Sequence, residues 1–323
     1  MKNIIVLTIL VIIICAVFPN NSVYCQESGK YEFTVGTQLG FVYGQAIELV
    51  YPTDTMGELL SELKWDMKPV FYYGVHLDFS RNDISAGPGF FSSLSFKMGI
   101  PSDSGTLENR DWMSTENSAL THFSSHTNRT NEFYWLDAAL GATIPVADGI
   151  YIKPFLSTSW MRFGFSARDG YGIYARANGS NKYHPIEDDP ELKDFTGQTV
   201  ITYEQNWFIV AAGFGIGTTY PFTIDTSFLI SPLVFCTAVD EHLSKGTTYV
   251  DFPRWGLFVE QSMRMSFDIK QIILSLDFSY RYITNSKGAT YIKSNGGEFF
   301  RSRGESGAGL SLMSIGLLAR LRL

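Results

Sequence analysis

Long segments in which apolar and polar side chains alternate constrain the fold of this chain more than any other feature. From Ile272 to Tyr282, every second residue is apolar or aromatic, and most of the residues between them are polar. Tyr31–Phe41 and Phe71–Phe79 follow the same rule. Successive side chains of a β-strand point to opposite faces of a sheet, so this period predicts strands with one apolar face.

The length of these strands and the aromatic residues on their apolar faces favour a membrane barrel over a soluble β-sandwich. Lipid on one side of the sheet accounts for the aromatic crowding. Backbone groups cannot stay unpaired in hydrocarbon, so the sheet should close on itself. Counting the alternating segments gives about five long hairpins. We therefore predict an all-β fold, a ten-stranded antiparallel transmembrane β-barrel that projects above the membrane.

Turns and polar stretches indicate which end of the barrel faces outward. Pro145–Gly149 is short enough for a turn on the inner side of the membrane. Four longer polar stretches suit extracellular loops, namely Thr53–Ser61, Ser102–Arg129, Arg176–Gly197 and Thr284–Ser306. The last segment, Gly309–Leu323, alternates again, but it ends in Leu where many membrane barrels end in an aromatic residue.

The N-terminal residues predict export from the cytoplasm. Lys2 precedes an apolar run, Ile4–Phe18, and a short polar stretch then ends at Cys25. This order is typical of a secretory signal peptide. We predict a signal peptide at residues 1–25 and a single barrel domain at residues 26–323. The alternative is an uncleaved anchor helix, for which the apolar run is short.

Composition narrows the classes of function. Asp and Glu total 32 against 25 Lys and Arg, which argues against a nucleic-acid-binding surface. Without the signal peptide, Cys236 would be the only thiol, so we expect no intramolecular disulfide. The chain has no His, Cys and Glu set with zinc-ligand spacing. We therefore expect neither a metal nor a resident cofactor.

Asp240-Glu241-His242 follows a strand near the predicted outer end of the barrel. At period two, Asp240 and His242 share a face. A carboxylate beside an imidazole orients the ring and stabilises its protonated form, which makes His242 a candidate general base toward water. Taken alone, such a pair is more typical of a solvated loop.

A second polar segment, Asn109–Met113, is a candidate for the opposite wall of the same site. It resembles a motif of the omptin family, in which two Asp residues spaced i and i+2 directly precede Trp-Met. Here the second is Asp111, and Asn109 replaces the first. In omptins the two aspartates face an Asp-His pair across a groove at the barrel mouth, and a water held between them attacks the peptide bond.

The resemblance extends in the same order along nearly the whole mature chain. The matching segments are Leu39–Tyr51, Ser61–Trp65, Asn131–Phe133, Phe165–Gly170, Ile173–Tyr174, Asp240–His242 and Thr284–Gly288. It implies a monomeric aspartic-type endopeptidase of the bacterial outer membrane, with its active site facing the exterior. Its implied partners are peptides or proteins with basic residues and an outer-membrane lipid, and nucleic acid is not among them.

The resemblance also implies roles for single residues. Asp240 and His242 would be the activating pair, Asp111 the intact carboxylate of the opposite wall, and Asn109 its altered partner. Glu48 would keep one carboxylate of the pocket for a basic side chain before the cut. The usual partner of that carboxylate is replaced by Ala238. The carboxylate of a second pocket is replaced by His122, and Asp251 could restore a charge there.

Further residues would act around this centre. Glu132 and Tyr174 would line the groove. Arg162 matches one basic contact of a lipopolysaccharide site that family members need for activity, whereas Trp160 and Asn206 replace two others. We therefore expect lipopolysaccharide or another outer-membrane lipid as a possible activator rather than a cofactor.

Other functions stay open at this point. Asn109 favours an omptin-fold protein without proteolysis, such as an adhesin or another surface-interaction barrel. A third hypothesis is a simple porin, but the family motifs that occur in the same order along the chain argue against it. Ser124 and His126 match a Ser-x-His of the family that is not a nucleophile-base dyad, so we do not expect a serine hydrolase.

Overall fold

The computed structural model describes residues 31–52, 59–81, 87–113, 119–178, 182–219 and 222–323. Tyr31–Leu323 form one unit by themselves. The predicted signal peptide, residues 1–25, lies outside the described residues. Within these ranges, no helix is long and apolar enough to cross a membrane.

Strands of 7 to 26 residues build the wall of the unit. They are β1 (Glu32–Tyr51), β2 (Ser61–Ser80), β3 (Gly89–Gly99), β4 (Ser102–Asp111), β5 (His122–Ala147), β6 (Ile150–Ala175), β10 (Thr199–Thr218), β11 (Thr223–His242), β12 (Thr247–Pro253), β13 (Phe258–Ile269), β14 (Ile272–Ser294) and β15 (Phe300–Arg322). The shorter elements are β7 (Ala177–Asn178), β8 (Lys182–Tyr183), β9 (Pro190–Asp194) and the 3₁₀-helix η2 (Leu243–Lys245).

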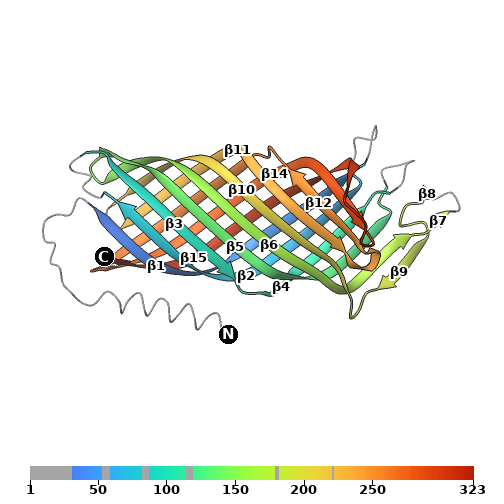
Figure 1. Ribbon diagram of the computed structural model, residues 1–323. Coiled ribbons are helices and arrows are strands. Elements are labelled where there is room, and N and C mark those ends of the chain that lie inside the picture. The colour runs from blue at the N-terminus through green and yellow to red at the C-terminus, as the bar shows by residue number, and fades with distance from the viewer. Residues whose placement is uncertain (1–30, 53–58, 82–86, 114–118, 179–181, 220–221) are drawn as a thin grey trace. The chain divides into compact units, whose positions relative to one another are not determined.

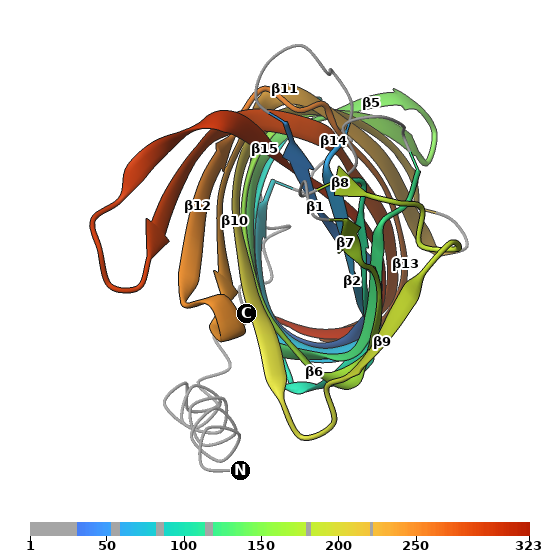
Figure 2. The same ribbon diagram turned by 90° about the vertical axis from the view of Figure 1, so that its right-hand side faces the viewer.

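The wall strands form a closed antiparallel ring with ten strand positions, each called a place below. Neighbours along the chain pair with one another, and β15 returns to pair with β1. β3 and β4 share one place, because both pair with β2 on one side and with β5 on the other. β12 and β13 likewise share the place between β11 and β14. Figure 2 shows the ring along its axis, and the predicted ten-stranded all-β barrel is confirmed.

Prolines mark the two interrupted places of the ring. Pro101 separates β3 from β4, and Pro253 ends β12 just before Trp255, whose φ is 63°. Proline has no N–H to donate to a ladder, so a strand tends to break or end there. The two halves of each place therefore pair with the same neighbours without forming one continuous strand.

The alternation seen in the sequence separates the two faces of the wall. On β14, the outward side chains Ile272 and Leu274 are 46% and 42% exposed, whereas the inward Ile273 and Ser275 are 5% and 4% exposed. Exposed apolar residues of this kind recur on the other strands, in the part of the barrel away from its polar outer end, which is called the lower barrel below. This band is the surface that faces lipid.

Charged and aromatic side chains fill the interior of the ring. Arg281 forms an ion pair with Asp137 at 2.9 Å. Nearer the mouth, the Trp65 ring is stacked with the rings of Phe165 and Tyr203. A barrel of this size that is packed with side chains supports a site at its mouth better than it supports a wide aqueous pore.

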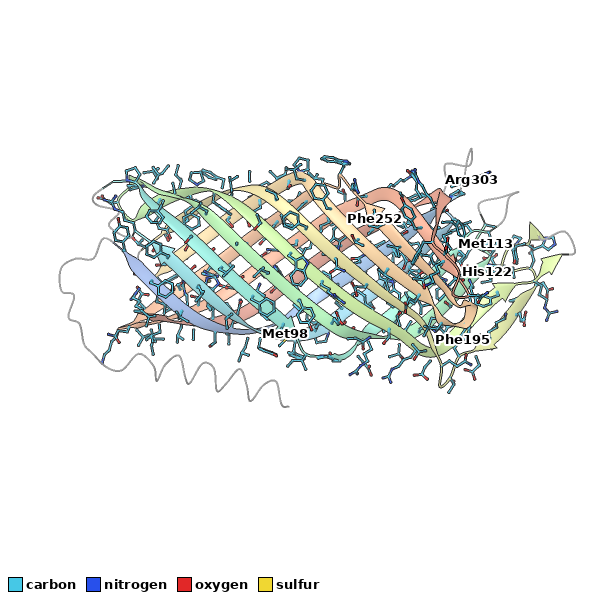
Figure 3. All side chains as sticks on the ribbon, viewed as in Figure 1. Met98, Met113, His122, Phe195, Phe252 and Arg303 are labelled. Carbon is cyan, nitrogen blue, oxygen red and sulfur yellow. The ribbon has the colours of Figure 1, made fainter. Side chains whose placement is uncertain are left out.

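Several polar stretches expected as extracellular loops are strands. β4 covers Ser102–Asp111 and β14 continues to Ser294, so the prediction of loops at Ser102–Arg129 and Thr284–Ser306 was largely wrong. Beyond the lipid, both faces of a strand meet polar surroundings, and the apolar alternation that reveals a strand is lost. These extensions form the mouth of the barrel, at the right of Figure 1, and Figure 3 places Met113 and His122 at this end.

Candidate active site

Two walls of the barrel mouth meet at one pocket. β4 contributes Asn109 and Asp111, and β11 contributes Asp240 and His242. Glu48, near the end of β1, lines the same pocket, whose volume is about 180 Å³. Two sequence segments that are far apart along the chain thus lie around one space.

The Asp240 and His242 side chains are in direct contact. Asp240 Oδ2 lies 2.7 Å from His242 Nε2, and the Asp240 side chain is 2% exposed. His242 keeps 20% of its side chain exposed, so its ring reaches the pocket. Because Nε2 faces the carboxyl, Nδ1 is the ring nitrogen left to accept a proton. The Tyr249 ring, from β12, packs edge-on against His242, with ring centroids 5.4 Å apart.

Burial sets the protonation state of this pair. It lowers the pKa of His242, and the nearby Lys245 ammonium adds to the effect. Burial also raises the pKa of Asp240 to about 8. Near neutral pH, the pair in the free protein is therefore a protonated carboxyl beside a neutral imidazole rather than an ion pair. A neutral imidazole is the form that can take a proton from water.

The facing wall is held together by Ser61 from β2. Ser61 Oγ lies 2.6 Å from Asp111 Oδ1 and 3.2 Å from Asn109 Oδ1. Asn109 Nδ2 also donates to Asp111 Oδ2 at 3.4 Å. Asn109 and Asp111 therefore point to the same side of β4, as period two predicts, and they present an amide and a carboxyl to the pocket.

A cluster of three carboxyls surrounds the buried side of the pair. Glu48, Asp240 and Asp251 are each 2% exposed. Burial, followed by repulsion from Asp240, raises the pKa of Glu48 well above its usual value. Burial also raises the pKa of Asp251 to about 6. Glu48 and Asp240 are within hydrogen-bonding reach of each other, so the two carboxyls share a proton instead of both carrying charge.

His122 and Tyr174 lie on the Asp111 side of the mouth. In the ladder, His122 of β5 pairs with Asp111 on one side and with Tyr174 of β6 on the other. The two rings are 5.1 Å apart between centroids, and the Tyr174 hydroxyl bonds to Ser124. Among the described residues, Tyr174 is not one of those that line the pocket. Directly paired residues share a face of a sheet, so Tyr174 lies on the same face as His122 and Asp111, two strands along from β4.

Glu132 and Arg162 lie together on the outer wall, away from the pocket. Arg162 Nε is 2.7 Å from Glu132 Oε2, and Arg162 Nη2 is 2.7 Å from Glu204 Oε2. The neighbouring Phe133 is 2% exposed and points inward, so Glu132 points outward. Asn206 donates to Glu204 in the same group. The structure therefore brings Glu132 to the expected lipid side, not to the groove, and two carboxylates offset the charge of Arg162.

Ser124 and His126 do not form a nucleophile-base pair in this arrangement. His126 Nδ1 is bonded to the carbonyl oxygen of Asp169 at 2.6 Å. Its ring packs against Phe195 at 5.2 Å between centroids, and Ser124 bonds to Tyr174 instead. Both residues support the wall between β5 and β6.

Three residues of the site were missed or left unplaced by sequence reasoning. Ser61 pairs with Asp111 in the ladder, a register that the matching segment at Ser61–Trp65 could have suggested. Tyr249 pairs with Asp240, and Asp251 pairs with Ala238, across β11 and β12. No local pattern gives that second register, because η2 and a left-handed Gly246 intervene.

Comparisons with known proteins agree with this geometry. The sequence profile of the omptin family matches residues 29–321. The crystal structure of the outer membrane protease OmpT from Escherichia coli superposes with a TM-score of 0.77 at 17% identity, covering 92% of this chain and 99% of that chain. The plasminogen activator of Yersinia pestis is 30% identical over 138 residues, which are 41% of this chain and 42% of that protein.

The family match covers nearly all of the described barrel, and the superposition gives the same fold. The match to the plasminogen activator spans less than half of either protein, so it adds a local likeness only. The chain belongs to the omptin family, and it is a β-barrel of the bacterial outer membrane.

Proposed function

We propose that this protein is an outer-membrane endopeptidase of the omptin type, which cleaves peptides near basic residues with a water activated by Asp240 and His242. The observation that carries the proposal is the single pocket lined by Asn109 and Asp111 from β4 and by Asp240 and His242 from β11. Its substrates are peptides or proteins that enter at the mouth, which faces the exterior of the cell.

In the proposed reaction, a water lies between the two walls. His242 removes a proton from the water as it attacks the carbonyl carbon of the scissile bond. Asp240, once ionised, stabilises the imidazolium that forms, and the imidazolium then returns the proton to the leaving amine. Asp111 accepts a hydrogen bond from the water and keeps it in line. No covalent intermediate with the protein is needed.

Asn109 is the weak point of this arrangement. Its amide can accept from or donate to the water, but it cannot carry charge or take a proton. A second carboxylate in its place would help to stabilise a protonated His242. The site is therefore expected to work more slowly than one with a carboxylate on both positions of β4.

The remaining residues have supporting roles in the proposal. Glu48 belongs to the pocket for the basic side chain before the cut, and Tyr174 lines the groove beyond His122, on the face that carries Asp111. Glu132 and Arg162 belong to an outer surface for lipopolysaccharide or another outer-membrane lipid. Because Arg162 is already paired with two carboxylates, this surface binds anionic lipid weakly.

The exported form in this proposal is residues 26–323, a single barrel that acts as a monomer after a signal peptide at residues 1–25 is removed. A second candidate function is an omptin-fold adhesin or other surface-interaction barrel with little or no proteolysis. Asn109 favours it, because the substitution removes one of the polar groups that would act on the water.

Cleavage of a fluorogenic peptide with two adjacent basic residues tests the proposal. The protein is refolded in detergent and assayed with and without lipopolysaccharide, beside a His242→Ala variant as the matched control. We expect cleavage by the unaltered protein, more with lipopolysaccharide, and none by the variant. If the unaltered protein folds as a barrel and cleaves no peptide under either condition, the surface-interaction reading replaces the protease.

A further inference from the structure

The carboxyl cluster beside the Asp240–His242 pair is not satisfied within the described part of the chain. One oxygen of each carboxyl has no hydrogen-bond partner there: Glu48 Oε2, Asp240 Oδ1 and Asp251 Oδ1. Each of the three residues is 2% exposed, and all three line the pocket. Buried polar atoms are almost always paired. The proton shared by Glu48 and Asp240 can join those two carboxyls, but Asp251 Oδ1 is left without a donor among the described residues, which indicates a donor that comes from outside the chain.

We propose that Asp251 is a specificity-determining residue, which together with Glu48 receives a lysine or arginine side chain of the substrate in this pocket. The inference rests on the proposed peptide hydrolysis at the adjoining pair. In this proposal β12 supplies a carboxyl of the pocket, because β11 has no carboxyl at that position.

The ladder between β11 and β12 explains how Asp251 comes to this place. Asp251 is paired directly with Ala238, and the two side chains are 2% and 1% exposed. Ala238 offers no polar group, so β12 supplies the carboxyl at this level of the wall. Hydrogen bonds from Thr290 and Ser306 favour the charged form of Asp251 and fix its direction.

The chemistry of the pocket suits a long cationic side chain. Val50, Tyr51 and Leu63 line it beside the carboxyls and can pack against an aliphatic stem. A guanidinium offers five donors and an ammonium three, and both bind best to acceptors that are desolvated and converge. A neutral side chain of the same length would leave the buried Asp251 carboxylate without a cationic partner.

Among the described residues, no lysine or arginine of the chain itself is paired with the carboxyls of this pocket. Lys245 lines the pocket, but its side chain is exposed, and among the described residues no ion pair joins it to Glu48, Asp240 or Asp251. Its ammonium lies near enough to act on Asp240 and His242 through space.

Binding of the cation would also change the protonation of the pair. The proton shared by Glu48 and Asp240 is displaced when a positive charge enters, which leaves Asp240 ionised beside His242. The titratable groups that face the shared proton are Asp251, His242, Lys245, Glu241, Tyr203 and Tyr249. A basic side chain would therefore raise kcat as well as lower KM, and its advantage would shrink as the pH falls.

The test compares two peptides that differ only before the cut, one with arginine and one with citrulline, its neutral isostere. The protein variants are Asp251→Asn, Ala238→Asp and the double variant, with Glu191→Gln as a control that removes the same charge from the exposed strand β9. We expect Asp251→Asn to lower the arginine-to-citrulline ratio of kcat/KM by about 10-fold to 100-fold. Adding Ala238→Asp should restore most of the ratio, and Glu191→Gln should leave it unchanged.

A measurement of peptide binding without cleavage tests this inference separately from the proposed function. In a His242→Ala background, the same two peptides are titrated by fluorescence anisotropy, so that the result does not depend on cleavage. Tighter binding of the arginine peptide that requires Asp251 supports the inference even if the unaltered protein cleaves nothing. An unchanged preference in Asp251→Asn, with barrel formation verified by heat-modifiable gel mobility, overturns the inference. It would leave the proposed hydrolysis standing if cleavage is observed.

Discussion

Replacing Asn109 with Asp restores a carboxylate on the β4 wall and should raise the rate of peptide cleavage. The change is nearly isosteric, so the pocket keeps its shape. An added anion favours the protonated form of His242 and so raises its pKa, which burial holds low. We expect an increase in kcat/KM of about tenfold or more, which corresponds to about 1.4 kcal/mol of transition-state stabilisation.

The structure also predicts the pH at which this gain is seen. Asn109 Nδ2 lies 3.4 Å from Asp111 Oδ2, so Asn109→Asp places two carboxylate oxygens at about that separation. Two charges there repel by about 5 kcal/mol at an effective dielectric constant of about 20. Solvent screening at this half-buried wall reduces the repulsion. The altered pair therefore holds one proton at acid pH, and the gain should grow as the pH rises from about 5 to about 8.

The assay is kcat/KM for the fluorogenic peptide at four pH values, with lipopolysaccharide present. Asn109→Ala serves as the control that removes the amide without adding charge, and it should lower the rate at every pH. An Asn109→Asp variant that is no faster than the unaltered protein at pH 8 would contradict this prediction. It would mean that the amide only positions the water and that charge at this place is not limiting.

Three further outcomes are expected. His242→Ala should lower kcat/KM by about 10²-fold to 10⁴-fold at unchanged barrel formation, because the general base is lost, and retained activity would place the base elsewhere. Asp251→Asn should stabilise the barrel above about pH 6 but not at pH 4. Burial raises the Asp251 pKa from 3.8 to about 6, so the folded protein keeps a proton that the unfolded chain loses, and stability falls as the pH rises through this window. The difference is about 3 kcal/mol at most, measured by urea titration in detergent, and equal stabilisation at both pH values would contradict it. The refolded protein should give a strand-type circular dichroism spectrum and move differently on a gel before and after boiling, and a helix-dominated spectrum would contradict the barrel.

The lower barrel and the two walls of the site could be predicted from the sequence because they rest on local rules. On β14, lipid imposes the apolar alternation from Ile272 to Tyr282, and the structure separates the faces accordingly. Asp240 and His242 are two residues apart on one strand, so period two places them on one side. The resemblance to omptins then supplied what spacing cannot, namely that the β4 wall lies opposite β11.

The parts that the sequence did not reveal depend on register across turns and irregular strands. Asp251 follows η2 and Gly246, whose φ of 58° belongs to the left-handed region, and no alternation count carries across such a turn. Glu132 follows a register shift between Thr130 and Glu132, which separates it from the pattern of the preceding residues. The upper parts of β4 and β14 were predicted as loops, because strands outside the lipid need no apolar face.

A double-mutant cycle of Asp111→Asn and His242→Ala shows whether the β4 and β11 walls act on one water, as proposed. Residues that act as a unit are non-additive, since removing the second costs little once the first is gone. We predict that the double variant cleaves the fluorogenic peptide about as slowly as the slower single variant, with all three proteins forming barrels. Losses that multiply in the double variant would contradict a shared water and would show that the two walls act independently.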